Sequence, residues 1–167
     1  PLSDDVSHSP TLHADVEIDL LAYALSGYSL HVGIGYRHLR VDLGAYAMDL
    51  PSFMESHKQL DGAFDGFGVK VQYFLFAEQR GAFVGVDAGL SRLRVEEKQG
   101  NGAVRHDQLG AGVNFGYRFT FLEGFYATPW LGLGYTLNAR DLSVNGKTLE
   151  VSPFTVFPAV HLGYRFR

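Results

Sequence analysis

Apolar and polar positions alternate along almost the whole of this chain. Between residues 109 and 121, one parity carries Leu109, Ala111, Val113, Phe115, Tyr117, Phe119 and Phe121, while the other is mainly glycine and polar residues. A period of two residues is typical of β-strands. The pattern predicts eight strands, at residues 14–25, 27–37, 39–50, 64–76, 81–96, 106–121, 124–140 and 149–166.

The connections between these strands alternate in length. Tight connections are expected near residues 37–39, 77–80 and 121–124, and longer, polar ones at 51–63, 97–105 and 141–148. The short pair Ser26-Gly27 is the exception. Long connections at one end and short ones at the other predict an all-β, eight-stranded, antiparallel up-and-down barrel. We expect a single domain over residues 1–167, with residues 1–13 as an N-terminal periplasmic tail.

The apolar face of this barrel is predicted to point outward, toward lipid. It carries large side chains on every strand, too much volume for the interior of an eight-stranded barrel. The opposite face is rich in glycine: Gly33, Gly35, Gly44, Gly68, Gly85, Gly89, Gly110, Gly112, Gly116, Gly132, Gly134 and Gly163. Glycine weakens strands, so a solvated outer face has little use for it, whereas a narrow interior needs small residues. A soluble ligand-binding barrel, apolar inside, is the alternative.

Composition narrows the function classes. Charged residues make up 19% and the formal net charge is −4, which argues against a nucleic-acid partner. The chain has no cysteine, which excludes disulfides and thiolate metal sites. No apolar run reaches the 18 or so residues of a membrane helix. We expect no cofactor and no metal.

Eight alternating strands, glycine at inward positions and a last strand ending in Tyr164 and Phe166 resemble the small outer-membrane β-barrel proteins of Gram-negative bacteria. This group contains the OmpA-type and OmpX-type barrels. The resemblance covers nearly the whole chain, although Arg167 follows the aromatic residue on which members usually finish. It implies a bacterial outer-membrane location, a monomer, and contact with membrane lipid and lipopolysaccharide.

The tripeptide Gly-Tyr-Arg occurs three times, at residues 35–37, 116–118 and 163–165. Each copy falls at the end of a strand that runs toward the short connections, with tyrosine facing outward. Tyrosine favours the lipid–water boundary because its ring is apolar and its hydroxyl is polar. The predicted lipid-boundary aromatics are Tyr36, Tyr73, Tyr117, Tyr164 and Phe166.

Charged residues of the opposite parity are expected inside the barrel. The predicted interior polar network consists of Glu17, Asp19, His31, Arg37, Arg40, Asp42, Lys70, Asp87, Asn114, Arg118, His161 and Arg165. Because isolated charges in a narrow interior are costly, ion pairs should form. The expected pairs are Arg165 with Glu17 or Asp19, Arg118 with Asp87, and Arg37 or Arg40 with Asp42. Such a layer plugs the barrel, and a proton or ion path through it is the alternative.

Catalytic candidates are sparse. Loop 51–63 holds Ser52, Ser56 and His57, and the next long connection is followed by His106. No G-x-S-x-G nucleophile elbow accompanies them. Arg92 and Arg94 near the outer rim fit either lipopolysaccharide phosphates or ordinary solvated charges.

The sequence therefore predicts an outer-membrane barrel with a plugged, charged interior. We expect a structural or interaction role at the cell envelope, through lipopolysaccharide or through an external partner of the long loops. A lipid-A-modifying enzyme and a small channel are the alternatives.

Overall fold

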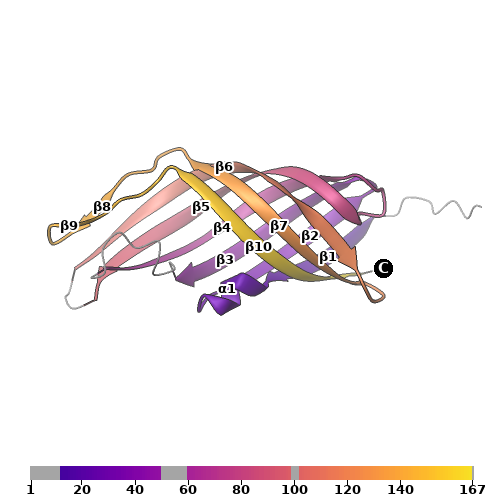
Figure 1. The fold of residues 1–167 in the computed structure, drawn as a ribbon, viewed down its shortest axis with the longest axis horizontal. Coiled ribbons are helices and arrows are strands. Elements are labelled where there is room, and N and C mark those ends of the chain that lie inside the picture. The colour runs from indigo at the N-terminus through magenta and orange to yellow at the C-terminus, as the bar shows by residue number, and fades with distance from the viewer. Residues whose placement is uncertain (1–11, 50–59, 99–101, 167) are drawn as a thin grey trace, which may run out of the picture.

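The chain folds into a closed barrel of eight antiparallel strands in a computed structural model (Figure 1). The structure describes residues 12–49, 60–98 and 102–166. Each barrel strand pairs with its neighbours in the chain, and β1 closes the barrel against β10. The barrel strands are β1 (His13–Asp19), β2 (Tyr28–Tyr36), β3 (Leu39–Asp49), β4 (Leu60–Phe74), β5 (Gly81–Glu97), β6 (Ala103–Thr120), β7 (Phe125–Thr136) and β10 (Phe154–Arg165). The predicted fold class is confirmed.

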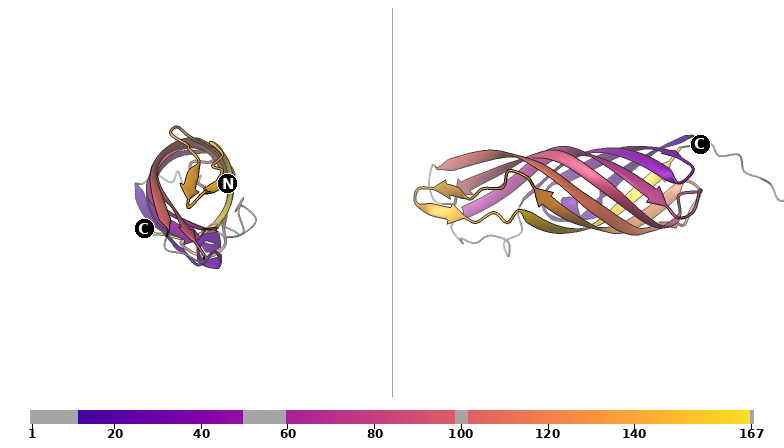
Figure 2. Two further views of the ribbon diagram at one scale, coloured as in Figure 1. Left: turned by 90° about the vertical axis from the view of Figure 1, so that its left-hand side faces the viewer. Right: turned by 90° about the horizontal axis from the view of Figure 1, so that it is seen from above.

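The two ends of the barrel differ. We call one the turn end: it holds the short connections between β2 and β3, β4 and β5, and β6 and β7, together with the end of β10. The other is the loop end, where β8 (Leu142–Val144) and β9 (Lys147–Leu149) project as a two-stranded hairpin (Figure 1). Viewed along its axis, the barrel is a ring with this hairpin over its loop end (Figure 2).

The predicted strand at residues 14–25 is wrong beyond Asp19. The chain there forms a short helix, α1 (Leu20–Ala24). The Asp19 carboxylate accepts from the backbone N–H of Leu21 at 3.1 Å and of Val160 at 3.3 Å, so it caps the helix and ties it to β10. The run of apolar residues from Leu20 breaks the alternation, and Ala22 on the inner side of the helix is fully buried.

The hairpin β8–β9 is the second departure, because residues 141–148 were predicted as a loop and residue 149 as the start of the last strand. The two strands are joined by Asn145 and Gly146, at φ values of 49° and 79°. An Asn-Gly pair with positive φ at both positions is typical of a type I′ hairpin turn. The barrel strand β10 begins only at Phe154.

The two faces of the wall have the polarity of a protein in lipid. Outward residues such as Val84 and Phe119 are 58% and 54% exposed, whereas the inward Arg40 and Arg118 are each 1% exposed. No helix in the described part of the chain has the length and apolar character needed to cross a membrane. Between the two ends of the barrel, the outer face is thus apolar, and buried charges lie on the inner face.

Candidate functional site

Arg40 of β3 is the centre of the polar interior. Its Nε donates to both carboxylate oxygens of Asp15 at 3.1 Å, and its Nη2 donates to Asp42 at 3.1 Å. Its Nη1 donates to the side-chain oxygen of Gln72 at 3.0 Å. The guanidinium is fully buried, and its fixed fork of donors suits several acceptors at once. One side chain thus joins β1, β3 and β4 across the lumen.

Glu17 of β1 continues the polar interior on the other side. Its two oxygens accept from Arg118 at 2.6 Å and from the Nδ1 of His161 at 2.7 Å. The Nη2 of Arg40 lies 3.3 Å from the same carboxylate. Arg118 also donates to the hydroxyl of Thr128 at 3.2 Å. These contacts bring β6, β7 and β10 into the same set of bonds.

His31 of β2 and Lys70 of β4 also belong to this set of polar contacts. Asp42 contacts the Nδ1 of His31 at 2.9 Å and lies 3.4 Å from Lys70. The ammonium of Lys70 lies 4.7 Å from the ring centre of Trp130, within the range of a cation–π contact.

On the opposite wall, Asn114 receives a long hydrogen bond of 3.4 Å from Gln72 and donates to Asp87 at 2.7 Å. The lumen network is the set of these connected residues: Asp15, Glu17, His31, Arg40, Asp42, Lys70, Gln72, Asp87, Asn114, Arg118, Thr128 and His161. It contains at least one residue from each of the eight barrel strands. A network that reaches every strand crosses the whole lumen.

Three residues of the predicted interior network lie outside the lumen network. Arg37 was predicted inside and is exposed, because it lies in the β2–β3 turn at a φ of 51° and its guanidinium lies 5.5 Å from the Tyr36 ring. Asp19 is buried but caps α1. Arg165 donates to the backbone carbonyls of Glu78 at 2.8 Å and Gln79 at 3.4 Å, at the turn end.

The expected ion pairs were right in one case. Arg40 does contact Asp42. Arg118 was expected beside Asp87 but reaches Glu17, and Arg165 contacts neither Glu17 nor Asp19. The expectation considered only adjacent strands, whereas in an eight-stranded barrel a long side chain also reaches strands across the lumen.

The expectation also left out residues whose parity indicated an inward position. Asp15 has the same parity as Glu17 and Asp19, and it is fully buried against Arg40. Thr128 faces the lumen by the alternation of β7 and is also buried. Alternation alone was sufficient to find both.

The predicted lipid-boundary aromatics lie at the turn end with exposed side chains. Their exposed fractions run from 36% to 47%, for Tyr36, Tyr73, Tyr117, Tyr164 and Phe166. The centre of the Tyr164 ring lies 4.8 Å from that of Phe125 and 5.2 Å from that of Phe166, so the aromatic surface continues from β7 onto β10 and the residue that follows it.

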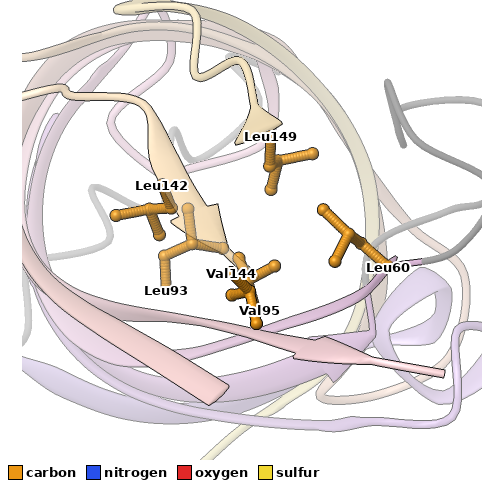
Figure 3. Close-up of a cluster of buried hydrophobic side chains, with 6 residues drawn as sticks. All are labelled: Leu60, Leu93, Val95, Leu142, Val144 and Leu149. Atoms are coloured by element: carbon orange, nitrogen blue, oxygen red, sulfur yellow. The ribbon is translucent and has the colours of Figure 1, made fainter. Parts of the chain in front are cut away.

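An apolar cluster lies at the loop end, which we call the hairpin cluster. Figure 3 shows its six buried residues: Leu60, Leu93, Val95, Leu142, Val144 and Leu149. Three come from β4 and β5 and three from the hairpin, which thus packs against the inner side of the wall. This cluster was not predicted, because residues 141–148 form a short segment rich in polar residues that was expected to be a loop.

Glu97 adds a polar contact to the hairpin, beyond the apolar part of β5. It forms an ion pair with Lys147 and accepts from the amide of Asn145 at 2.9 Å. The Lys147 ammonium and the Asn145 amide hold the pKa of Glu97 below its ordinary value. The carboxylate is therefore ionised at neutral pH, when the ion pair to the hairpin is fully formed.

Space in the lumen is uneven. A Cβ added at Gly163, in the turn half, would overlap the buried ring of Tyr126. A Cβ added at Gly110 or Gly134, in the loop half, would meet nothing nearer than 3.7 Å or 3.9 Å, respectively. The lumen is therefore tightly filled beside Gly163, whereas there is room for a methyl group at Gly110 and at Gly134.

The described geometry resembles that of a known class of barrels. The chain matches the crystal structure of a major outer membrane protein from Thermus thermophilus with a TM-score of 0.57 and 12% sequence identity, over 95% of this chain and 100% of that one. This chain has the fold of a small outer-membrane β-barrel. The predicted resemblance to such barrels is confirmed at the level of the fold.

Two more solved structures are similar to this one. The N-terminal β-barrel domain of Pseudomonas aeruginosa OprF has a TM-score of 0.48 at 16% identity, over 93% of this chain and 96% of that one. Neisserial surface protein A has a TM-score of 0.47 at 18% identity, over 92% and 94%. No protein-family model and no curated protein sequence matches the chain.

Of the four catalytic candidates, the structure describes His106 alone. Ser52, Ser56 and His57 lie outside the described residues. His106 faces inward and contacts the backbone carbonyl of Asn138 at 2.8 Å. Its neighbour Asp107 points outward to Arg92, so a carboxylate next to it in sequence does not orient the imidazole. Within the described residues, no group of three or more His, Asp or Glu side chains is placed to hold a metal ion.

Replacing Leu142 with aspartate should release the β8–β9 hairpin from the hairpin cluster. Leu142 is 2% exposed, and an unpaired carboxylate buried there would cost at least about 2 kcal/mol. We expect amide hydrogen exchange in β8 and β9 to rise at least about tenfold, while exchange in β5 stays slow. The control is Ser143→Asp, at the adjacent exposed position. Equal exchange in the two variants would show that the cluster does not hold the hairpin.

Proposed function

We propose that this protein is a monomeric integral barrel of a bacterial outer membrane, with a lumen closed by side chains and a structural or interaction role at the envelope. The observation that carries the proposal is the lumen network, which draws on all eight barrel strands. Its central guanidinium groups are almost wholly inaccessible to solvent. The hairpin cluster adds an apolar closure at the loop end.

The outer wall supports a membrane location. On β6 the outward residues are apolar from Leu109 to Phe119, about eleven residues, and a strand crosses a bilayer in about 9–11. Exposed tyrosines border this band at the turn end. In outer-membrane barrels short turns face the periplasm and long loops face outward. The turn end is therefore assigned to the periplasm and the loop end to the exterior.

The same observations favour a closed barrel over a small channel. An ion crossing the lumen has to pass Arg40 and Arg118, whose side chains are engaged with Asp15 and Glu17. Displacing these contacts leaves charges buried without partners, which is strongly unfavourable. If the protein binds external molecules, it does so at the loop end, where the β8–β9 hairpin projects from the barrel (Figure 1).

Reconstitution into planar lipid bilayers tests this proposal. We expect the wild-type protein to insert without discrete conductance steps. The variant Glu17→Ala, Arg118→Ala removes one opposite-charge pair and two long side chains from the network, so it should show steps. Circular dichroism confirms that both proteins are folded barrels. Regular conductance steps from the wild type would refute a closed lumen.

A further inference from the structure

A sharp change of polarity crosses the outer face of β4, β5 and β6 near the loop end. Phe67, Leu90 and Leu109 lie side by side in register and are all exposed. Two residues farther along each strand, the next outward row is Asp65, Arg92 and Asp107. The step from an apolar row to a charged row marks the upper limit of the lipid-facing band.

Two arginines lie opposite each other in the row above. Arg94 of β5 is the register partner of Arg105 of β6, and both face outward. Like charges directly opposite on neighbouring strands destabilise a sheet. An anion between the two guanidinium groups, or an acidic side chain beside each of them, would relieve this repulsion.

Only some of these outward arginines have an acidic partner. Asp107 accepts from Arg92 at 2.7 Å, and Glu96 forms an ion pair with Arg94. Asp65 lies opposite Arg92 in the register. Among the described residues, no hydrogen bond or ion pair is formed by Arg105. In the part of the chain that the structure describes, Arg105 is therefore the arginine of this face that has no acidic partner, and it lies directly opposite Arg94.

We propose that Arg94 and Arg105 together bind a phosphate group of an outer-leaflet glycolipid of the lipopolysaccharide type. Arginine presents a planar fork of donors that suits phosphate, and two forks facing one anion relieve their mutual repulsion. This inference rests on the proposed outer-membrane location, which places the loop end in the outer leaflet.

The height of the pair fits a lipid headgroup. Arg94 is four residues beyond Leu90, the last outward apolar residue of β5, so it lies about 13 Å farther along the strand. Strand tilt reduces that height above the apolar band, and a long arginine side chain spans much of the remainder. The alkyl part of each side chain can then lie along the wall while the guanidinium meets the phosphate.

The test compares lipid A that carries its phosphates with the same lipid after enzymatic dephosphorylation. Binding to the folded protein in detergent micelles is measured by native mass spectrometry. The wild type should retain phosphorylated lipid A at least about tenfold better than the dephosphorylated lipid, the change expected for losing one or more charge-assisted hydrogen bonds. The double variant Arg94→Gln, Arg105→Gln should lose that preference.

The matched control is Arg80→Gln, because Arg80 is an exposed arginine at the turn end, paired with Glu78. It should bind like the wild type. Equal retention of both lipids by the wild type, or an unchanged preference in the double variant, overturns the phosphate site. If the wild type instead fails to insert into bilayers, the proposed membrane location fails, and this separates the two proposals.

Discussion

Replacing Arg40 with methionine should lower the free energy of unfolding by about 3–5 kcal/mol. The substitution keeps much of the side-chain volume but removes the guanidinium that donates to Asp15, Asp42 and Gln72. These acids would remain buried without their main counter-charge. Unfolding by denaturant in detergent micelles, followed by the fluorescence of Trp130, the single tryptophan, measures the change.

Arg92→Met is the matched control for this prediction. Arg92 also forms an ion pair, with Asp107, but both side chains are at least half exposed. Exposed pairs contribute about 0–1 kcal/mol, so this variant should unfold almost like the wild type. Adding Asp15→Asn to Arg40→Met should restore part of the lost stability, because one uncompensated acid is removed. Similar losses for Arg40→Met and Arg92→Met would contradict a stabilising role of the lumen network.

The fold was predictable because a strand has only two faces. Once the parity of β3 is known, Arg40 and Asp42 must share the inward side, and a slip of one residue would reverse every position. The same rule assigned Asp87, Asn114 and His161 to the interior without any knowledge of contacts.

Partners across the lumen were not predictable in this way. Alternation says which face a residue occupies, whereas the contact between Arg118 and Glu17 depends on barrel diameter, strand tilt and side-chain length together. Alternation also no longer predicts which face a residue occupies once its strand has ended. The positive φ of Arg37 shows that β2 has ended before this residue. The helix α1 escaped prediction because its N-cap, Asp19, also has the parity of an inward strand residue.

The hairpin cluster shows a third limit. Leu142 and Val144 follow the alternation of a strand, but the segment is short and flanked by polar residues. A three-residue strand has little signal of its own, and its apolar face is identified only by the inner wall against which it packs. The Asn145-Gly146 turn was the one local signal available.

Replacing Gly163 with alanine should destabilise the barrel by about 1–3 kcal/mol, although it adds a single methyl group. The added Cβ would overlap the ring of Tyr126, its register partner on β7. That ring is 1% exposed, and the guanidinium of Arg118 lies 4.0 Å from its centre. The ring therefore has little free space into which to move, and its displacement would disturb the contact of Arg118 with Glu17.

Gly110→Ala is the matched control, because it adds the same methyl group at another glycine that faces the lumen. Gly110 also faces the lumen from a barrel strand, but the nearest atom to an added Cβ is a backbone oxygen at 3.7 Å. Without overlap, alanine mainly restricts the unfolded chain, so this variant should be as stable as the wild type or more stable by up to about 1 kcal/mol. The two variants, compared by denaturant unfolding in the same micelles, separate glycine retained for close packing from glycine beside open space. Equal losses at both positions would contradict this difference, because they would mean that the lumen beside Gly110 is as tightly filled as the lumen beside Gly163.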